Sequence, residues 1–116
     1  MDAEEVVRAA LASAGIAAYY EVPTENVPAA YATVQRSGGG HHDLVVEDPQ
    51  VIIHCRAQTN KAARDMAHAV RDAVLSIPES FDSAFASDIN TTYRDDDLDT
   101  GQNRWKVVVE LTMTDS

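Results

Sequence analysis

The sequence is short of cysteine, of basic residues and of long apolar runs, and each shortage narrows the class of protein. Cys55 is the only cysteine among 116 residues, so no disulfide forms within the chain and a reducing compartment suffices. The 9 basic residues stand against 19 acidic ones, and the formal net charge of −10 argues against binding DNA through its phosphates. No run approaches the ~20 apolar residues of a membrane span, and residues 1–5 lack the basic-then-apolar order of a signal peptide. We therefore expect one globular domain over residues 1–116, without a membrane segment.

The clearest pattern is a strand followed by an amphipathic helix, and it covers residues 50–77. In the segment Gln50–Arg56 every second residue is suited to a core, which predicts a strand with one buried face. Thr59 or Asn60 is suited to cap the following helix, and Pro78 is suited to end it. The apolar stripe of this helix recurs at spacings of three and four residues: Ala63, Met66, Ala67, Val70, Ala73, Val74, Ile77.

The other elements are expected to complete a two-layer sandwich. A short helix is predicted from Asp2 to a C-terminal cap at Gly15. Further strands are predicted at Ile16–Val22, Tyr31–Arg36, Ile89–Arg94 and Trp105–Met113. The fold class is α+β or α/β, with a mixed, mostly antiparallel sheet of about five strands and two main helices. The predicted core includes Met66, Val70, Val74, Trp105, Val107, Val109 and Leu111.

The connections are predicted from turn-forming residues. Ser37–Gly40 is expected to break the strand before it, and His41–Pro49 to form a polar connection with one apolar patch at residues 44–46. Residues 79–87 show no sustained period, which favours a short turn of helix or an irregular cover. The acidic segment Asp95–Asn103 is predicted to be a loop.

The acidic loop invites comparison with a calcium site, because Asp95, Asp97 and Asp99 alternate. An EF-hand loop needs glycine at its sixth position and glutamate at its twelfth. This sequence has Thr100 and Lys106 there, so the run is interpreted as a solvated hairpin loop.

No other pattern indicates catalysis or a cofactor. The 4 histidines have no spacing typical of zinc. His54 and Cys55 are neighbours in a strand and point to opposite faces, so they cannot form a nucleophile–base pair. Ser37–Gly40 lacks the lysine of a phosphate loop. We predict that the protein is not an enzyme, has no cofactor and buries Cys55 as an inert thiol.

The order of these elements is accompanied by a series of short phrases. After the N-terminal helix they are Tyr20–Pro23, Arg36–Gly39, Asp48–Ala57, Ala62–Val74 and Asp99–Thr112. In this order they resemble the tail terminator, or tail completion, proteins of long-tailed bacteriophages, especially those of actinobacterial hosts. The resemblance spans nearly the whole chain, although each phrase is weak alone.

The resemblance implies a structural virion protein. Proteins of this kind form a homohexameric ring that caps the tail tube, stops its polymerisation and joins it to the head-side connector. The implied place is the head-proximal end of the tail, after assembly in the host bacterial cytoplasm. A head-closure or stopper protein, or another ring protein of the neck, is the nearest alternative. A small cytosolic ligand-binding or regulatory domain is an alternative of a different class.

The segments Arg36–Asp48 and Asp95–Asn103 are the expected partner contacts, because such loops have little to do within a small domain; solvated hairpin ends are the alternative. DNA is expected to pass through the ring without specific binding, past an acidic lumen to which Asp95–Asp99 or Glu79–Asp88 contributes. The acidic surplus could instead serve solubility or pair with basic neighbours. The candidate contact residues are Arg36, His41, His42, Asp95, Asp97 and Asp99.

Overall fold

A computed structural model describes residues 2–41, 46–81 and 84–114. Its helices and strands are grouped along the chain in an α+β order. In sequence order they are α1 (Ala3–Ser13), β1 (Ala18–Tyr19), β2 (Tyr31–His41), β3 (Val46–Ala57), α2 (Asn60–Leu75), α3 (Ile77–Ser80), β4 (Ala84–Arg94) and β5 (Asn103–Thr114).

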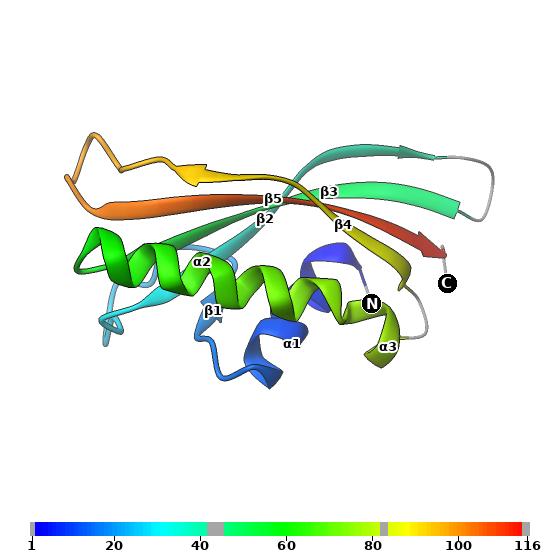
Figure 1. Ribbon diagram of the computed structural model, residues 1–116, viewed down its shortest axis with the longest axis horizontal. Helices are drawn as coiled ribbons and strands as arrows, with labels where there is room; N and C mark the ends of the chain where they lie inside the picture. The colour runs from blue at the N-terminus through cyan, green and yellow to red at the C-terminus, as the bar shows by residue number, and fades with distance from the viewer. Residues whose placement is uncertain (1, 42–45, 82–83, 115–116) are drawn as a thin grey trace.

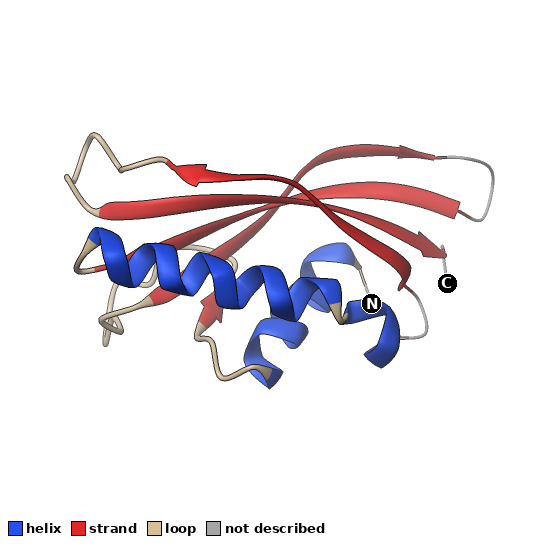
Figure 2. Ribbon diagram, viewed as in Figure 1, coloured by secondary structure: helices blue, strands red, loops and turns tan. Residues whose placement is uncertain are grey.

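The strands form one sheet in the order β1-β2-β3-β5-β4. β1 runs parallel to β2, and every other neighbouring pair is antiparallel. All three helices lie on the same side of this sheet, and its other side carries no helix among the described residues (Figure 2). The predicted fold class, a two-layer sandwich with a mixed, mostly antiparallel sheet and two main helices, is confirmed.

Both long helices begin where the sequence supplies a cap. Asp2 and Glu5 form a reciprocal capping box at the start of α1. The Thr59 hydroxyl accepts a hydrogen bond from the Ala62 amide at 3.1 Å at the start of α2. The end predicted for this helix was wrong, because α2 stops at Leu75. Pro78 lies instead in the first turn of α3, where its missing amide hydrogen costs no hydrogen bond.

The predicted break at Ser37–Gly40 was also wrong, since β2 continues through it to His41. The pairing of β2 with β3 shifts between Arg36 and Gly38, as a bulge does, and then resumes to the pair of His41 with Glu47. Gly38 has φ of 153°, a conformation that glycine adopts at little cost. The polar connection expected after residue 41 therefore belongs largely to a paired hairpin arm; residues 42–45 lie outside the described residues.

Two other strands differ in length from their predictions. The segment Ile16–Val22 contributes only Ala18 and Tyr19 to the sheet, as β1. β4 begins at Ala84, five residues before the predicted start at Ile89, because it pairs with β5 as far as Met113. Residues 79–87 are thus shared between α3 and β4, with residues 82–83 outside the described part.

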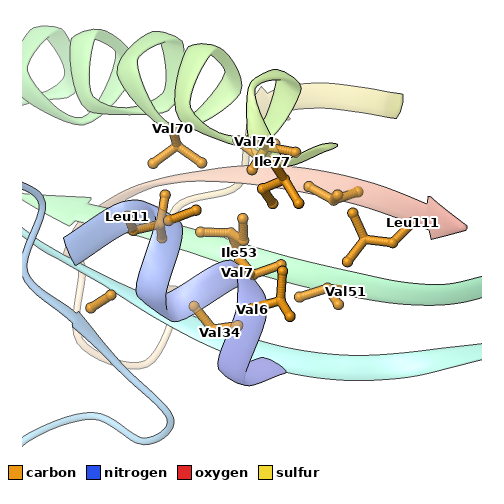
Figure 3. Packing of buried hydrophobic residues seen from close by; sticks show 14 of the residues in the cluster. Val6, Val7, Leu11, Val34, Val51, Ile53, Val70, Val74, Ile77 and Leu111 are labelled. Atoms are coloured by element: carbon orange, nitrogen blue, oxygen red, sulfur yellow. The ribbon is translucent and has the colours of Figure 1, made fainter. Parts of the chain in front are cut away.

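The core lies between the helices and the covered face of the sheet (Figure 3). Val70 and Val74 of α2 are fully buried, as are Val107, Val109 and Leu111 of β5. Met66 and Trp105 are partly buried and pack against this cluster. α1 adds Val6, Val7 and Leu11 from the other end of the layer, also fully buried. The α2 stripe and the β5 face belong to one cluster, so truncating either leaves a cavity that neighbours fill only partly.

Truncation of Leu111 tests this packing. Leu111→Ala is expected to lower the free energy of unfolding by about 2–4 kcal/mol, since it removes buried methyl groups and leaves a cavity. Leu98→Ala is the matched control, because Leu98 is 96% exposed, and it should cost less than about 0.5 kcal/mol. Urea unfolding followed by circular dichroism measures both, and equal small losses would show that Leu111 is not part of the core.

Candidate assembly surface

The molecule is elongated, with principal extents of 42 × 25 × 24 Å. The turn between β4 and β5 lies at one end of the long axis, and β2 and β3 extend to the other end (Figure 1). Each end presents backbone and side chains that the helices do not cover. These two ends and the helix-free face of the sheet are surfaces that the helices leave open.

The β4–β5 turn is held by a cluster of arginines and aspartates. Arg56 Nη1 lies 3.3 Å from Asp97 Oδ2 and 3.4 Å from Gln102 Oε1. Arg104 Nη2 lies 3.3 Å from Asp95 Oδ2, and its Nε donates to the Asp95 carbonyl oxygen at 2.7 Å. Arg56 is buried and Arg104 is half-buried, so each needs a carboxylate where it enters the protein.

Asp97 also shapes the turn itself. Its Oδ1 accepts hydrogen bonds from the amides of Asp99 at 3.0 Å and Thr100 at 3.4 Å. The bond from Asp99, together with the one from Arg56, holds the pKa of Asp97 below its ordinary value. Gly101, with φ of 73°, closes the turn by donating to the Asp97 carbonyl oxygen at 2.7 Å. The turn is therefore fixed by its own acidic side chain.

Leu98 stands at the tip of this braced turn and is 96% exposed. A single exposed leucine is ordinary on a protein surface. Here the two flanking residues, Asp97 and Asp99, are tied into hydrogen bonds, so the leucine is presented in a fixed position. An apolar side chain carried on a braced turn at one end of a long molecule is suited to a partner's pocket.

The helix-free face carries His54 beside the cluster. Its Nε2 lies 3.9 Å from Asp95 Oδ2. Burial, followed by the positive charges of Arg104 and Arg56, lowers the pKa of His54 to about 4. The imidazole is therefore neutral at physiological pH.

The predicted contact residues fall into two groups in space. Asp95 and Asp97 are brought together by the arginines, and the Asp99 side chain stays exposed. Arg36 lies on β2 and bonds Glu47 of the same hairpin at 3.2 Å. His41 ends β2, and His42 lies outside the described residues. The premise that these segments have little to do within the domain was wrong. Their role as partner contacts stays a prediction.

The residues that sequence reasoning missed are the basic partners of the acidic run. Arg56 and Arg104 organise the turn, and neither was expected to do so. The sequence did contain a signal. Strand alternation points Arg56 to the face opposite that of its neighbour, the buried Cys55, and Arg94 and Arg104 flank the acidic loop. An acidic loop between arginines indicates pairing, as between Arg94 and Asp96 at 2.9 Å.

The described residues include no group of three or more histidine, cysteine, aspartate or glutamate side chains placed to hold a metal ion. Asp95 and Asp97 face guanidinium groups, which compete with a cation for their oxygens. Cys55 is fully buried, and burial raises the pKa of its thiol to about 12. No helix among the described residues is long and apolar enough to cross a membrane.

The described chain is an α+β two-layer sandwich whose sheet has one open face. No protein-family model matches the sequence, and no curated protein matches it. The fold is similar to a chain in a solved structure described as the virion of a native gene transfer agent (GTA) particle. The similarity has a TM-score of 0.67 at 15% sequence identity and covers 97% of this chain and 87% of that chain. The two chains therefore share a fold from nearly end to end.

The acid side of the stability curve tests the environment of His54. Because the pKa of this imidazole is about 4 in the fold and 6.5 when it is fully solvated, the unfolded chain binds a proton in this window that the folded chain does not. Stability is therefore fully present above pH 6.5 and falls as the pH is lowered towards 4. His54→Gln should lose less stability over that window, measured by urea unfolding at a series of pH values.

The control is His68→Gln, on the exposed face of α2. It should keep the wild-type pH dependence, because it leaves the cluster intact. Superimposable curves for the wild type and His54→Gln would contradict the assignment.

Proposed function

We propose that this protein is a structural component of a phage-like virion. The observation that carries the proposal is the shared fold with a chain of the GTA virion, which extends over 97% of this chain. The absence of a candidate metal cluster among the described residues, and the burial of Cys55, are compatible with a role that needs no chemistry. The protein contributes shape and contacts to an assembly.

Within that class, we propose the role of tail terminator. Most of the phrases of the sequence that resemble tail terminators lie on the elements that build the fold, including β3, α2 and β5. The chain forms a homohexameric ring at the head-proximal end of the tail, caps the tube protein and meets the head-side connector. A head-closure protein or another ring protein of the neck is the alternative role.

The two ends of the molecule suit contacts above and below a ring. The β4–β5 turn with Leu98 lies at one end, and the hairpin arm, which includes Arg36 and His41, extends to the other (Figure 1). We propose that one end meets the tube and the other meets the connector. The braced geometry of the turn supports this, because a preformed contact loses less conformational entropy on binding.

The charge of the chain suits a channel through which DNA passes. A ring of six copies would carry about six times the formal −10, or about −60 in total. Acidic groups on the lumen would repel the phosphates of the DNA. Phosphates that bound there would instead slow the ejection of the DNA through the ring. An assembled structure tests this directly, since the residues nearest the axis should be mainly Asp and Glu rather than Arg64 or Arg71.

The role is tested by mixing the purified chain with tail tubes of the same particle. We expect rings of tube diameter at one end of each tube in negative-stain images, and tubes of defined length when the chain is present during polymerisation. A chain that never binds tube ends, and stays monomeric at high concentration, contradicts the terminator role. Binding to the portal side of filled heads instead supports the head-closure role.

Leu98 tests the contact made by the braced turn. Leu98→Asp should leave the melting temperature unchanged, because the side chain touches almost nothing in the monomer. It should weaken capping at least tenfold if the leucine fills a partner's pocket, a loss expected when a buried anchor is replaced by a charge. Leu98→Met is the conservative control and should retain capping. Normal capping by Leu98→Asp would remove the turn tip from the interface.

A further inference from the structure

The helix-free face of the sheet is hollowed beside β2 and β3. The hollow has a volume of about 320 Å³. Thr33 and Gln35 of β2 and His54 and Arg56 of β3 form one side of it, and Tyr20–Val22 forms the other. Thr33 and Arg56 are buried polar residues, so the hollow is a polar feature on a face without helices. It borders the β4–β5 turn, because Arg56 also bonds Asp97 of that turn.

Arg56 lines this hollow and has an unused hydrogen-bond donor. Its side chain is 9% exposed, and its bonds to Asp97 and Gln102 are both made by Nη1. Nε is buried and has no partner among the described residues. The edge formed by Nε and Nη2 is the one that pairs with a carboxylate through two parallel hydrogen bonds. A buried donor left unpaired destabilises the fold, so a ligand there would satisfy an existing deficit.

The surroundings of the hollow favour an anion. Arg104, Arg56 and Lys106 all lower the pKa of His54, against one opposing charge from Asp95. The lining contains one acid, Glu21, which is exposed and makes no hydrogen bond in the described structure. Arg56 and Arg104 are already paired with Asp97 and Asp95, so the case for an anion rests on the Nε donor of Arg56, which is unpartnered among the described residues.

The wall of the hollow is free to adjust. Residues 21–30 follow β1, and no hydrogen bond among the described residues involves them. Asn26 in this segment has φ of 52°, as in a turn. Glu21 and Val22 can therefore move without breaking a hydrogen bond among the described residues. Such side-chain and loop adjustments are common when proteins bind.

The opposite margin of the same face presents carboxylates. Asp88 of β4 and Glu110 of β5 are Cα partners in the sheet, and both are exposed. Their neighbours Ile89 and Val109 pack in the core, so the two acids point to the helix-free face. Like charges directly opposite each other destabilise a strand pair. Asn90 donates to Glu110 at 3.3 Å, but no basic side chain among the described residues forms an ion pair with either acid.

We propose that the hollow is a carboxylate receptor, filled by Asp88 or Glu110 of the neighbouring copy in a ring. The hollow lies towards the β2 side of the sheet and the acids lie on β5 and β4, so the contact joins unlike patches of the two copies. The carboxylate of one copy then accepts hydrogen bonds from the Nε edge of Arg56 in its neighbour. The repulsion between Asp88 and Glu110 in the first copy is thereby reduced. The inference rests on the proposed ring and specifies how its copies recognise one another.

The acids provide the sharper test. The double variant Asp88→Asn with Glu110→Gln keeps a side-chain carbonyl oxygen at each position and removes both charges. The monomer should keep or gain stability, because two facing like charges disappear. The association constant of the copies should fall at least tenfold, as expected when a charge pair is broken. Sedimentation velocity over a concentration series at fixed salt measures it. The opposite signs of the two effects separate recognition from folding.

A matched pair of acids serves as the control. Asp72→Asn with Glu79→Gln removes the same charge from α2 and α3, on the helix side. This variant should assemble as the wild type does. On the receptor side, Arg56→Lys keeps the charge but lacks the two-donor edge, so it should assemble poorly. Arg64→Lys on α2 is the control and should assemble as the wild type does.

The outcomes distinguish the receptor from the proposed function. Rings that form equally well from the wild type and from the acid double variant overturn the receptor and leave the ring intact. A wild-type chain that stays monomeric and does not cap tubes overturns both. If acetate at constant ionic strength shifts the His54 ring signals while the double variant assembles normally, the hollow binds a small carboxylate and the neighbouring copy is not its source.

Discussion

In the described part of the chain, helices cover one face of the sheet and leave the other open, and much of the structure follows from that constraint. β3 and β5 place alternate side chains under the helices, so the residues between them must face water or find polar partners. Arg56 is the extreme case, because it lies on the open face and is nevertheless buried. A buried guanidinium requires a carboxylate, and the β4–β5 turn supplies Asp97. The acidic turn therefore supplies the carboxylate that the buried arginine of the open face needs.

This pairing connects the turn to the rest of the molecule. Trp105 at the start of β5 donates to Asn60 at 2.9 Å, and Asn103 donates to the Gln58 carbonyl oxygen at 3.0 Å. The turn, the start of α2 and the end of β3 thus form one bonded end of the domain. The helix side and the open side have different chemistry, apolar packing on one and ion pairs on the other. A protein with two such faces is suited to directional assembly, in which unlike surfaces of neighbouring copies meet.

The fold was largely predictable, because its strongest signals are periodic. The helix stripe at Val70 and Val74 and the alternation through Val107 and Val109 each specify a buried face. The hairpin arm was not predictable, since three glycines after Ser37 favour a break unless a partner strand is present, and β3 is that partner. The site was harder still. Arg56 and Asp97 are 41 residues apart, and no local pattern shows that they meet.

The burial of Cys55 gives the chain an internal reporter of its own opening. The thiol lies on β3 between β2 and β5, and its pKa of about 12 leaves almost no thiolate to react while the sheet is closed. A thiol reagent therefore modifies the protein only during excursions that separate these central strands. With one cysteine in the sequence, the labelling rate counts those excursions without interference. Comparing the labelling rate of the free chain with that of the proposed ring would show how far neighbouring copies suppress the transient separation of these strands.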